Sequence, residues 1–147
     1  MRVLLLNGPN LNMLGQREPE IYGRDTVDDI VGRVQARGKE LDVDVIACQS
    51  NHEGALIDFI QQNQGSSDGM IINPGAFGHY SYALRDAIIA SNLPAIEVHI
   101  SNVHARERFR ERLVLSPACR GVITGLGWRG YLYALEALVA AAKEGTK

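Results

Sequence analysis

The 147-residue sequence has few cysteines, little net charge and no long apolar run. Cys48 and Cys119 are far apart and, like the four histidines, show no metal-ligand spacing, so we expect reduced thiols and no metal site. A formal net charge of −2 gives no electrostatic argument for binding nucleic acid or an anionic membrane. No segment approaches the roughly 20 apolar residues of a membrane span, and no signal-peptide core precedes Gly8 and Pro9. The sequence therefore predicts a soluble, cytoplasmic protein.

What the sequence does contain is the composition of an ordinary globular domain, with 46% hydrophobic and 22% charged residues. Its length suits one domain, spanning residues 1–147, with a substantial core. Short apolar runs predict five strands, at residues 3–6, 43–47, 70–72, 95–99 and 121–124. Helices are expected at about residues 26–38, 51–62 and 105–112. A further helix should bury Leu84, Ala87 and Ile88 and end near Asn92. The last helix should bury Tyr131, Leu135, Leu138 and Ala142.

Two of the helix starts carry capping signals. Thr26 can cap the first helix, and Ser50 with Glu53 forms the S-x-x-E pair of a capping box before the second. Strands and helices alternate five times, and the strands lack the two-residue alternation of a half-exposed sheet. This pattern predicts an α/β protein with a flavodoxin-like fold, a three-layer αβα sandwich around a five-stranded parallel sheet.

The longest connection, residues 8–23, lies between the first strand and the first helix. Strand-to-helix loops usually take two to six residues, and longer loops in compact domains tend to be lids or binding loops. The mixed composition of this loop, with Arg17 and Tyr22 among glycines, prolines and amides, argues against simple disorder. We expect residues 8–12 to form the floor of a site and residues 15–23 to form a lid that becomes ordered over a bound ligand.

Polar residues follow three predicted strands at their carboxyl ends, where α/β sheets bind ligands. These residues are Asn7 and Asn12 after the first strand, Asn73 and His79 after the third, and Glu97, His99 and Ser101 on and after the fourth. Glu97 and His99 are two residues apart on a strand, so their side chains point to the same face. The carboxylate can orient the imidazole as a proton donor near neutral pH, although a purely structural Glu–His pair fits the spacing equally well.

The other candidates have equally clear alternatives. His79 follows a glycine-rich turn, where it can donate to a ligand or simply cap a helix. Tyr22 can act as a base only if a cation such as Arg17 lowers its pKa from the usual value of about 10, and it could instead pack the loop down. Asn12 and Asn73 can bind hydroxyls, carbonyls or water, although turn asparagines are common.

Arg106 and Arg110 share a face of the predicted helix at 105–112 and can clamp a carboxylate; a solvated, salt-bridged helix is the alternative. Together the candidates suit a small, polyhydroxylated, anionic substrate and a proton abstraction coupled to loss of a leaving group. No nucleophile is paired with a base, so covalent catalysis is not expected.

Several of these stretches resemble the type II 3-dehydroquinate dehydratase family. The resemblance runs in order through LNGPNLNMLG, REP, IYG, QSNHEG, NPGA, EVHISN and GVITGLG, which begin at residues 6, 17, 21, 49, 73, 97 and 121. It covers nearly the whole chain and implies a flavodoxin-like fold and the reversible dehydration of 3-dehydroquinate to 3-dehydroshikimate, in aromatic biosynthesis or quinate breakdown. It also implies no cofactor and no Schiff-base lysine, in agreement with Lys39, Lys143 and Lys147 lying outside the predicted strand ends.

The resemblance implies a role for each site residue. Tyr22, as tyrosinate, removes a proton from the carbon next to the ketone, and Arg17 lowers the tyrosine pKa. Asn12 holds a water that stabilises the enolate, and His99, positioned by Glu97, protonates the departing hydroxyl. The residues implied to bind substrate are Asn73, His79, Ile100, Ser101 and Arg110, with Asp86 reaching a neighbouring subunit's site in a trimer. The family's assembly is a dodecamer of four such trimers.

The sequence departs from the family after Arg110. There the family usually has a His-Ser pair and an aromatic, whereas this chain continues with Glu111-Arg112-Leu113-Val114-Leu115, so we expect binding to survive and local packing to differ. Other functions of the same fold fit less well. A flavin or phosphate loop needs hydroxyls where this chain has Gly8-Pro9-Asn10, and a phosphoacceptor receiver domain needs acidic residues where it has Asn7 and Asn73.

Overall fold

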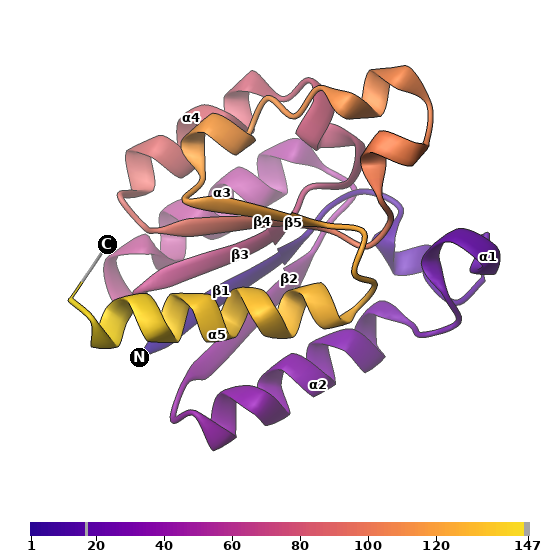
Figure 1. Ribbon diagram of the computed structural model, residues 1–147. Coiled ribbons are helices and arrows are strands. Elements are labelled where there is room, and N and C mark those ends of the chain that lie inside the picture. The colour runs from indigo at the N-terminus through magenta and orange to yellow at the C-terminus, as the bar shows by residue number, and fades with distance from the viewer. Residues whose placement is uncertain (17, 146–147) are drawn as a thin grey trace.

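A computed structural model describes residues 1–16 and 18–145, without the side chain of Tyr22, and places five strands in one parallel sheet (Figure 1). The strands are β1 (Arg2–Asn7), β2 (Asp44–Gln49), β3 (Gly69–Asn73), β4 (Ala95–His99) and β5 (Gly121–Thr124). Their spatial order is β2-β1-β3-β4-β5, and every neighbouring pair is parallel. The predicted flavodoxin-like α/β fold is therefore confirmed.

Helices cover both faces of the sheet (Figure 1). Helices α2 (Val27–Glu40) and α5 (Arg129–Lys143) lie on one face, and α3 (Glu53–Asn63) and α4 (Tyr82–Ser91) lie on the other. The short α1 (Pro19–Tyr22) projects from the end of the molecule where the strands finish. The chain thus forms the expected three-layer sandwich, with its long first loop at the carboxyl ends of the strands.

The central strand β1 shows why the strands read as continuous apolar runs. Val3 and Leu5 pack into the core beneath α2 and α5, whereas Leu4 and Leu6 pack into the core beneath α3 and α4. All four side chains are fully buried, because helices cover both faces of the sheet. No helix in the described part of the chain is long and apolar enough to cross a membrane.

One capping prediction is confirmed and the other is wrong. The Thr26 hydroxyl accepts a hydrogen bond from the Asp29 amide (3.1 Å), and the Asp29 carboxylate accepts one from the Thr26 amide (2.9 Å). At α3, however, the N-cap is His52, and the Ser50 hydroxyl only accepts the His52 amide (3.0 Å). The Glu53 carboxylate accepts a hydrogen bond from Ser81 instead, because tertiary contact with α4 replaces the local box.

The helix predicted at residues 105–112 is also wrong. Two short 3₁₀ turns, Val103–Ala105 and Arg108–Glu111, stand in its place, separated by an extended backbone at Arg106 (φ −118°, ψ −158°). Asn102 caps the first turn by accepting a hydrogen bond from the His104 amide (3.1 Å). A smaller correction concerns α5, where Ala141 is buried and Ala142 is exposed.

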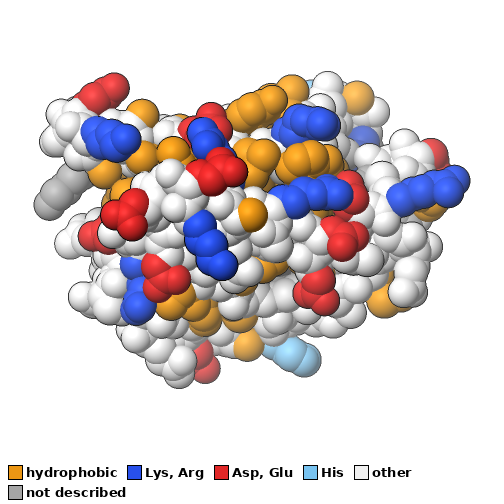
Figure 2. Space-filling model, turned by 90° about the horizontal axis from the view of Figure 1, so that it is seen from below, with side chains coloured by type: hydrophobic (Ala, Val, Ile, Leu, Met, Phe, Trp, Pro, Cys, Tyr) orange, Lys and Arg blue, Asp and Glu red, His pale blue; other side chains and the backbone are white. Residues whose placement is uncertain are grey.

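The face formed by α2 and α5 is charged but mixed. Figure 2 views this side and shows acidic and basic side chains side by side rather than a field of one sign. Arg37 pairs with Glu40 (2.7 Å) and Glu136 (3.1 Å), and Arg33 pairs with Asp25 (2.9 Å). These exposed pairs solubilise the surface and contribute little to stability.

Candidate active site

A cavity lies at the carboxyl ends of β1, β3 and β4, where the strand-end residues converge. Seven of the candidate residues line it: Asn73, His79, His99, Ile100, Ser101, Arg106 and Arg110. Glu97 lies behind His99 and is fully buried. Asn12 and Asp86 are exposed and are not among the described residues that line the cavity. Arg17 and the side chain of Tyr22 lie outside the described residues.

Asn10, and not Asn12, faces the cavity. Asn10 has a left-handed backbone (φ 68°), and the 3₁₀ turn that follows buries Leu11 and leaves Asn12 exposed. The side-chain oxygen of Asn51 accepts hydrogen bonds from the Asn10 amide (2.9 Å) and from the Gln49 side chain (3.3 Å). Asparagine is one of the few residues that tolerates this conformation, but because residue 12 is also an asparagine, the residue type alone did not distinguish the two positions.

The floor of the cavity is held where the loops after β1 and β3 meet. The Gly8 amide donates to the Asn73 carbonyl (2.8 Å), and a Cβ on Gly8 would overlap the Pro74 carbonyl. The side chain of Gln49 donates to the Gly8 carbonyl (3.1 Å) from the other side. Glycine is needed at position 8 because the two backbones approach so closely.

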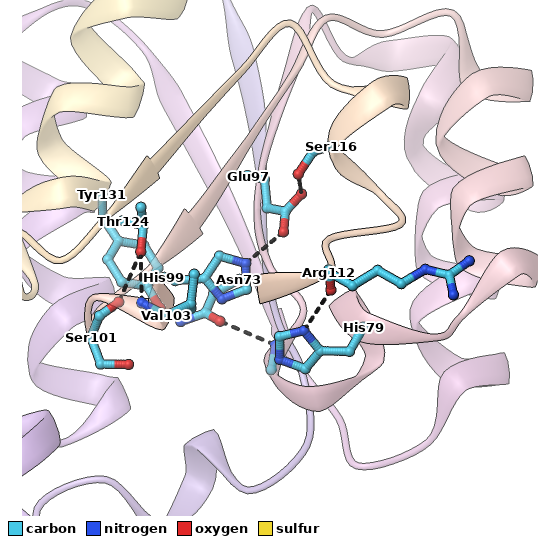
Figure 3. Close-up of polar contacts among 11 residues, drawn as sticks. Asn73, His79, Glu97, His99, Ser101, Val103, Arg112, Ser116, Thr124 and Tyr131 are labelled. Atoms are coloured by element: carbon cyan, nitrogen blue, oxygen red, sulfur yellow. Dashed lines mark hydrogen bonds and ion pairs between the residues drawn. The ribbon is translucent and has the colours of Figure 1, made fainter. Parts of the chain in front are cut away.

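A buried hydrogen-bond chain orients Asn73. Its side-chain nitrogen donates to the Tyr131 hydroxyl (2.8 Å), which donates to the side-chain oxygen of Asn7 (2.7 Å); Figure 3 shows Tyr131 beside Asn73. The side-chain oxygen of Asn73 accepts the Gly75 amide (3.1 Å). Both ends of the Asn73 amide are therefore fixed. The sequence predicts that Tyr131 lies on the buried face of α5. A buried phenol usually has a hydrogen-bond partner, and this rule was the only sequence signal for the contact.

The predicted pair of Glu97 and His99 is a hydrogen-bonded unit. Glu97 Oε2 lies 2.5 Å from His99 Nε2, and Glu97 Oε1 accepts a hydrogen bond from the Ser116 hydroxyl (2.8 Å; Figure 3). His99 is 6% exposed and forms part of the cavity wall, whereas Glu97 is 0% exposed. The contact of Ser116 was not anticipated, since nothing in its local sequence marks it.

His79 lies beside His99, with nearly parallel rings whose centres are 6.2 Å apart. Its Nδ1 donates to the Arg112 carbonyl (2.9 Å), which leaves Nε2 to accept a proton or a hydrogen bond. Burial lowers the pKa of His79, and the neighbouring His99 and Arg110 lower it further, although the hydrogen bond to Arg112 and the charge of Glu97 oppose this. His79 is accordingly a neutral imidazole at pH 7.

Two guanidinium groups give the cavity its positive charge. Arg106 and Arg110 both line it, and their side chains are only 13% and 17% exposed. Arg106 donates to the Ser101 hydroxyl (3.2 Å) and lies 3.8 Å from the carboxylate of Glu18, next to α1. Glu107 accepts a hydrogen bond from Arg110 (3.0 Å). The two arginines thus meet at the cavity without the helix that was expected to align them.

Residues 111–115 support the cavity mainly through their backbone. The Arg112 carbonyl accepts from His79, and the Val114 amide donates to the Gly78 carbonyl (2.8 Å). Val114 and Leu115 are buried in the core beneath α4. Because the backbone makes these contacts at positions 112 and 114, they do not depend on the identity of the side chains there.

Taken together, the cavity offers two cations, two imidazoles and two amides. This set can bind a small, hydroxylated anion and donate a proton to it. No cluster of three metal-binding side chains occurs among residues 1–16 and 18–145.

Comparison with known proteins agrees with this geometry. Residues 1–139 match the family model described as dehydroquinase class II. The chain is 53% identical to a 3-dehydroquinate dehydratase of Roseiflexus castenholzii over 145 residues, covering 99% of this chain and 92% of that protein. It is 52% identical to a catabolic 3-dehydroquinase of Aspergillus clavatus, covering 97% and 95%. The crystal structure of a type II dehydroquinase from Butyrivibrio crossotus superposes with a TM-score of 0.91 at 48% identity, covering 94% and 97%. The chain belongs to the class II dehydroquinase family.

Proposed function

We propose that the protein is a type II 3-dehydroquinate dehydratase, which converts 3-dehydroquinate reversibly into 3-dehydroshikimate and water without a cofactor. The observation that carries the proposal is the buried Glu97–His99 pair, which presents an imidazole to a cavity that also contains Arg106 and Arg110. A proton donor beside two cations suits a substrate with one carboxylate and a hydroxyl that must depart.

In the proposed reaction, Tyr22 as tyrosinate takes the proton from the carbon next to the ketone, and Arg17 lowers the tyrosine pKa. The electrons of the broken C–H bond move to the ketone oxygen and form an enolate. We assign the water that stabilises this enolate to Asn10 in place of Asn12, because Asn10 lies on the cavity wall. His99 then protonates the departing hydroxyl, the C–O bond breaks, and water leaves as the enolate collapses.

The remaining cavity residues would hold the substrate. Arg110 and the backbone amides of Ile100 and Ser101 would bind the carboxylate, and Asn73 and His79 would bind hydroxyls. Asp86 is exposed on α4, outside its own cavity, which suits a contact with a neighbouring subunit. We therefore propose a trimer-based dodecamer as the assembly.

The test is the absorbance of the conjugated enone that forms when the purified protein receives 3-dehydroquinate. Wild-type protein should produce this absorbance, and Tyr22→Phe should abolish turnover while substrate still binds. A fully active Tyr22→Phe variant would show that Tyr22 is not the base. Covalent inactivation by borohydride in the presence of substrate would instead reveal an imine, and the proposed mechanism would be wrong.

A further inference from the structure

Ser116 lies at the start of the 3₁₀ turn Ser116–Ala118, on the far side of Glu97 from His99 (Figure 3). Its hydroxyl is 2.8 Å from Glu97 Oε1, and Glu97 Oε2 is 2.5 Å from His99 Nε2. We infer that Ser116 is a positioning residue for catalysis, which fixes the Glu97 carboxylate and thereby the proton-donating His99. This inference rests on the proposed function, in which His99 protonates the leaving hydroxyl.

The carboxylate needs this second donor because it is completely buried. Glu97 is 0% exposed, so an oxygen without a partner would lose its hydration and gain nothing in return. Ser116 supplies the donor to Oε1, and this leaves Oε2 directed at the imidazole. Gly78 lies beside the pair, since a Cβ there would be in ordinary van der Waals contact with Oε2 (3.5 Å) and with His99 Cε1 (3.4 Å). Rotation of the carboxylate would move Oε2 away from His99 Nε2, and the ring would lose the contact that orients it.

Ser116 can act as a fixed point because its own segment is anchored independently of Glu97. The preceding residues Val114 and Leu115 are 5% and 0% exposed, and the Val114 amide donates to the Gly78 carbonyl. The Ser116 carbonyl accepts the Cys119 amide (3.0 Å). Cys119 adds no second negative charge to that of Glu97, because its thiol stays protonated. Burial, and then the charge of Glu97, raises the pKa of this thiol to about 12.

The arrangement also determines which imidazole nitrogen reacts. Because Nε2 is engaged by Glu97, Nδ1 is the nitrogen that can give a proton to the hydroxyl. One proton moves from Nδ1 to the departing oxygen, which takes both electrons of the C–O bond and leaves as water. The ring becomes neutral while its Nε2 proton stays on the bond to Glu97, and Ser116 keeps its own proton throughout.

The main experiment measures kcat and KM for Ser116→Ala and for the matched pair Ser116→Thr and Ser116→Val. Loss of the hydroxyl should lower kcat about tenfold, a part of the roughly 10²- to 10⁴-fold that a positioned proton donor contributes. KM should stay within about twofold, because Ser116 touches no substrate in this scheme. Ser116→Thr should keep kcat near the wild-type value, and Ser116→Val should lower it. Thr and Val have the same branched shape and differ in the hydroxyl, so this comparison holds even if Ser116→Ala folds poorly.

Two controls separate positioning from a general structural effect. The first is Ser67→Ala, at a residue just before β3. Like Ser116, Ser67 is half-buried and its hydroxyl makes a 2.8 Å hydrogen bond, in this case to the Asn63 carbonyl. Its loss should leave kcat and KM unchanged. In a double-mutant cycle, Ser116→Ala should add little to Glu97→Gln, because both act through one carboxylate. An unchanged kcat in Ser116→Val, or effects that multiply in the cycle, would overturn the inference.

A readout without substrate distinguishes this inference from the proposed function. The His99 Nε2 proton, hydrogen-bonded and buried, should give a downfield proton resonance in the free enzyme that is lost in Glu97→Gln and shifts in Ser116→Val but not in Ser116→Thr. Failure of wild-type protein to convert 3-dehydroquinate would refute the proposed function, and the resonance would still report whether Ser116 positions the Glu97–His99 pair. An identical resonance in Ser116→Val and wild type would refute the role of Ser116 alone.

Discussion

Asn10 and Asn12 differ by two positions but face different surroundings, and this offers a direct comparison of single residues. Asn10 is on the cavity wall with φ of 68°, so Asn10→Gly removes the amide without straining the backbone. We expect kcat to fall roughly 10²-fold, the usual cost of losing one group that stabilises an oxyanion. Asn12→Ala is the matched control and should keep near wild-type kcat. If steady-state assays showed the larger loss of kcat in Asn12→Ala, the water that stabilises the enolate would be assigned to Asn12.

His79 gives a prediction about pH. Its pKa is lowered in the folded protein, first by burial, so the unfolded chain binds a proton at a higher pH than the folded chain does. Stability should therefore be complete above the unfolded pKa of about 6.5 and should be lost as the pH falls from there toward the folded pKa.

Urea unfolding at about pH 7.5 and about pH 5.5 measures this loss. His79→Gln keeps a donor for the Arg112 carbonyl but cannot take up a proton, so it should lose less stability on acidification than wild type. His104→Gln, at an exposed histidine, controls for the loss of an imidazole elsewhere. Equal losses in wild type and His79→Gln would show that His79 does not contribute.

The sequence identified most of the cavity wall because strand ends are visible as patterns. Asn73, His79 and His99 each follow or end an apolar run, and parallel topology brings such ends together. The choice between Asn10 and Asn12 depended on one backbone rotation that no periodicity encodes. Ser116 reaches Glu97 through tertiary structure alone, so its role could not be predicted locally.

At the scale of elements, the strands were predictable and the irregular segments were not. The strands predicted at residues 95–99 and 121–124 agree with β4 and β5. Short apolar runs between turn residues favour buried strands over other secondary structure. The predicted helix at 105–112 failed because Arg106 and Arg110 serve the cavity, and tertiary contacts there override helical propensity. Glu53 likewise left its predicted capping box to accept Ser81 from another helix.

The junction of the loops after β1 and β3 can be tested with a pair of glycines. Gly8→Ala should destabilise the protein by at least about 2 kcal/mol, because its Cβ would overlap the Pro74 carbonyl and force the loops apart. Gly32→Ala, in the exposed middle of α2 with open space around it, should stabilise by about 0.5–1 kcal/mol. Thermal or urea unfolding compares the two, and a Gly8→Ala variant as stable as wild type would mean that the junction is not tight.

At the scale of the whole molecule, α4 carries the prediction about assembly. Tyr82 and Ile89 are 56% and 54% exposed and share one helical face with Asp86. If this face packs against another subunit, light scattering should give a mass several times that of the 16.1 kDa chain. Ile89→Asp should reduce that mass, and kcat/KM should fall with it, because Asp86 would no longer reach its neighbour's site.

The matched control is Tyr133→Ser, at a tyrosine that is 46% exposed on α5, on the opposite face of the sheet. This change should leave both mass and activity as in wild type. A monomeric wild-type protein with full activity would contradict the proposed assembly and the role of Asp86 together.

The hydrogen bond between Tyr131 and Asn7 joins residues 124 positions apart, from the last helix to the first strand. The ribosome synthesises the chain from its N-terminus, so α5 is made only after all five strands. The sheet can begin to pair early, but the amide of Asn73 gains its fixed orientation only when α5 arrives. The buried hydrogen bonds that orient Asn73 at the cavity can thus form only after the strands β1 and β3 and the start of α5 have all been made.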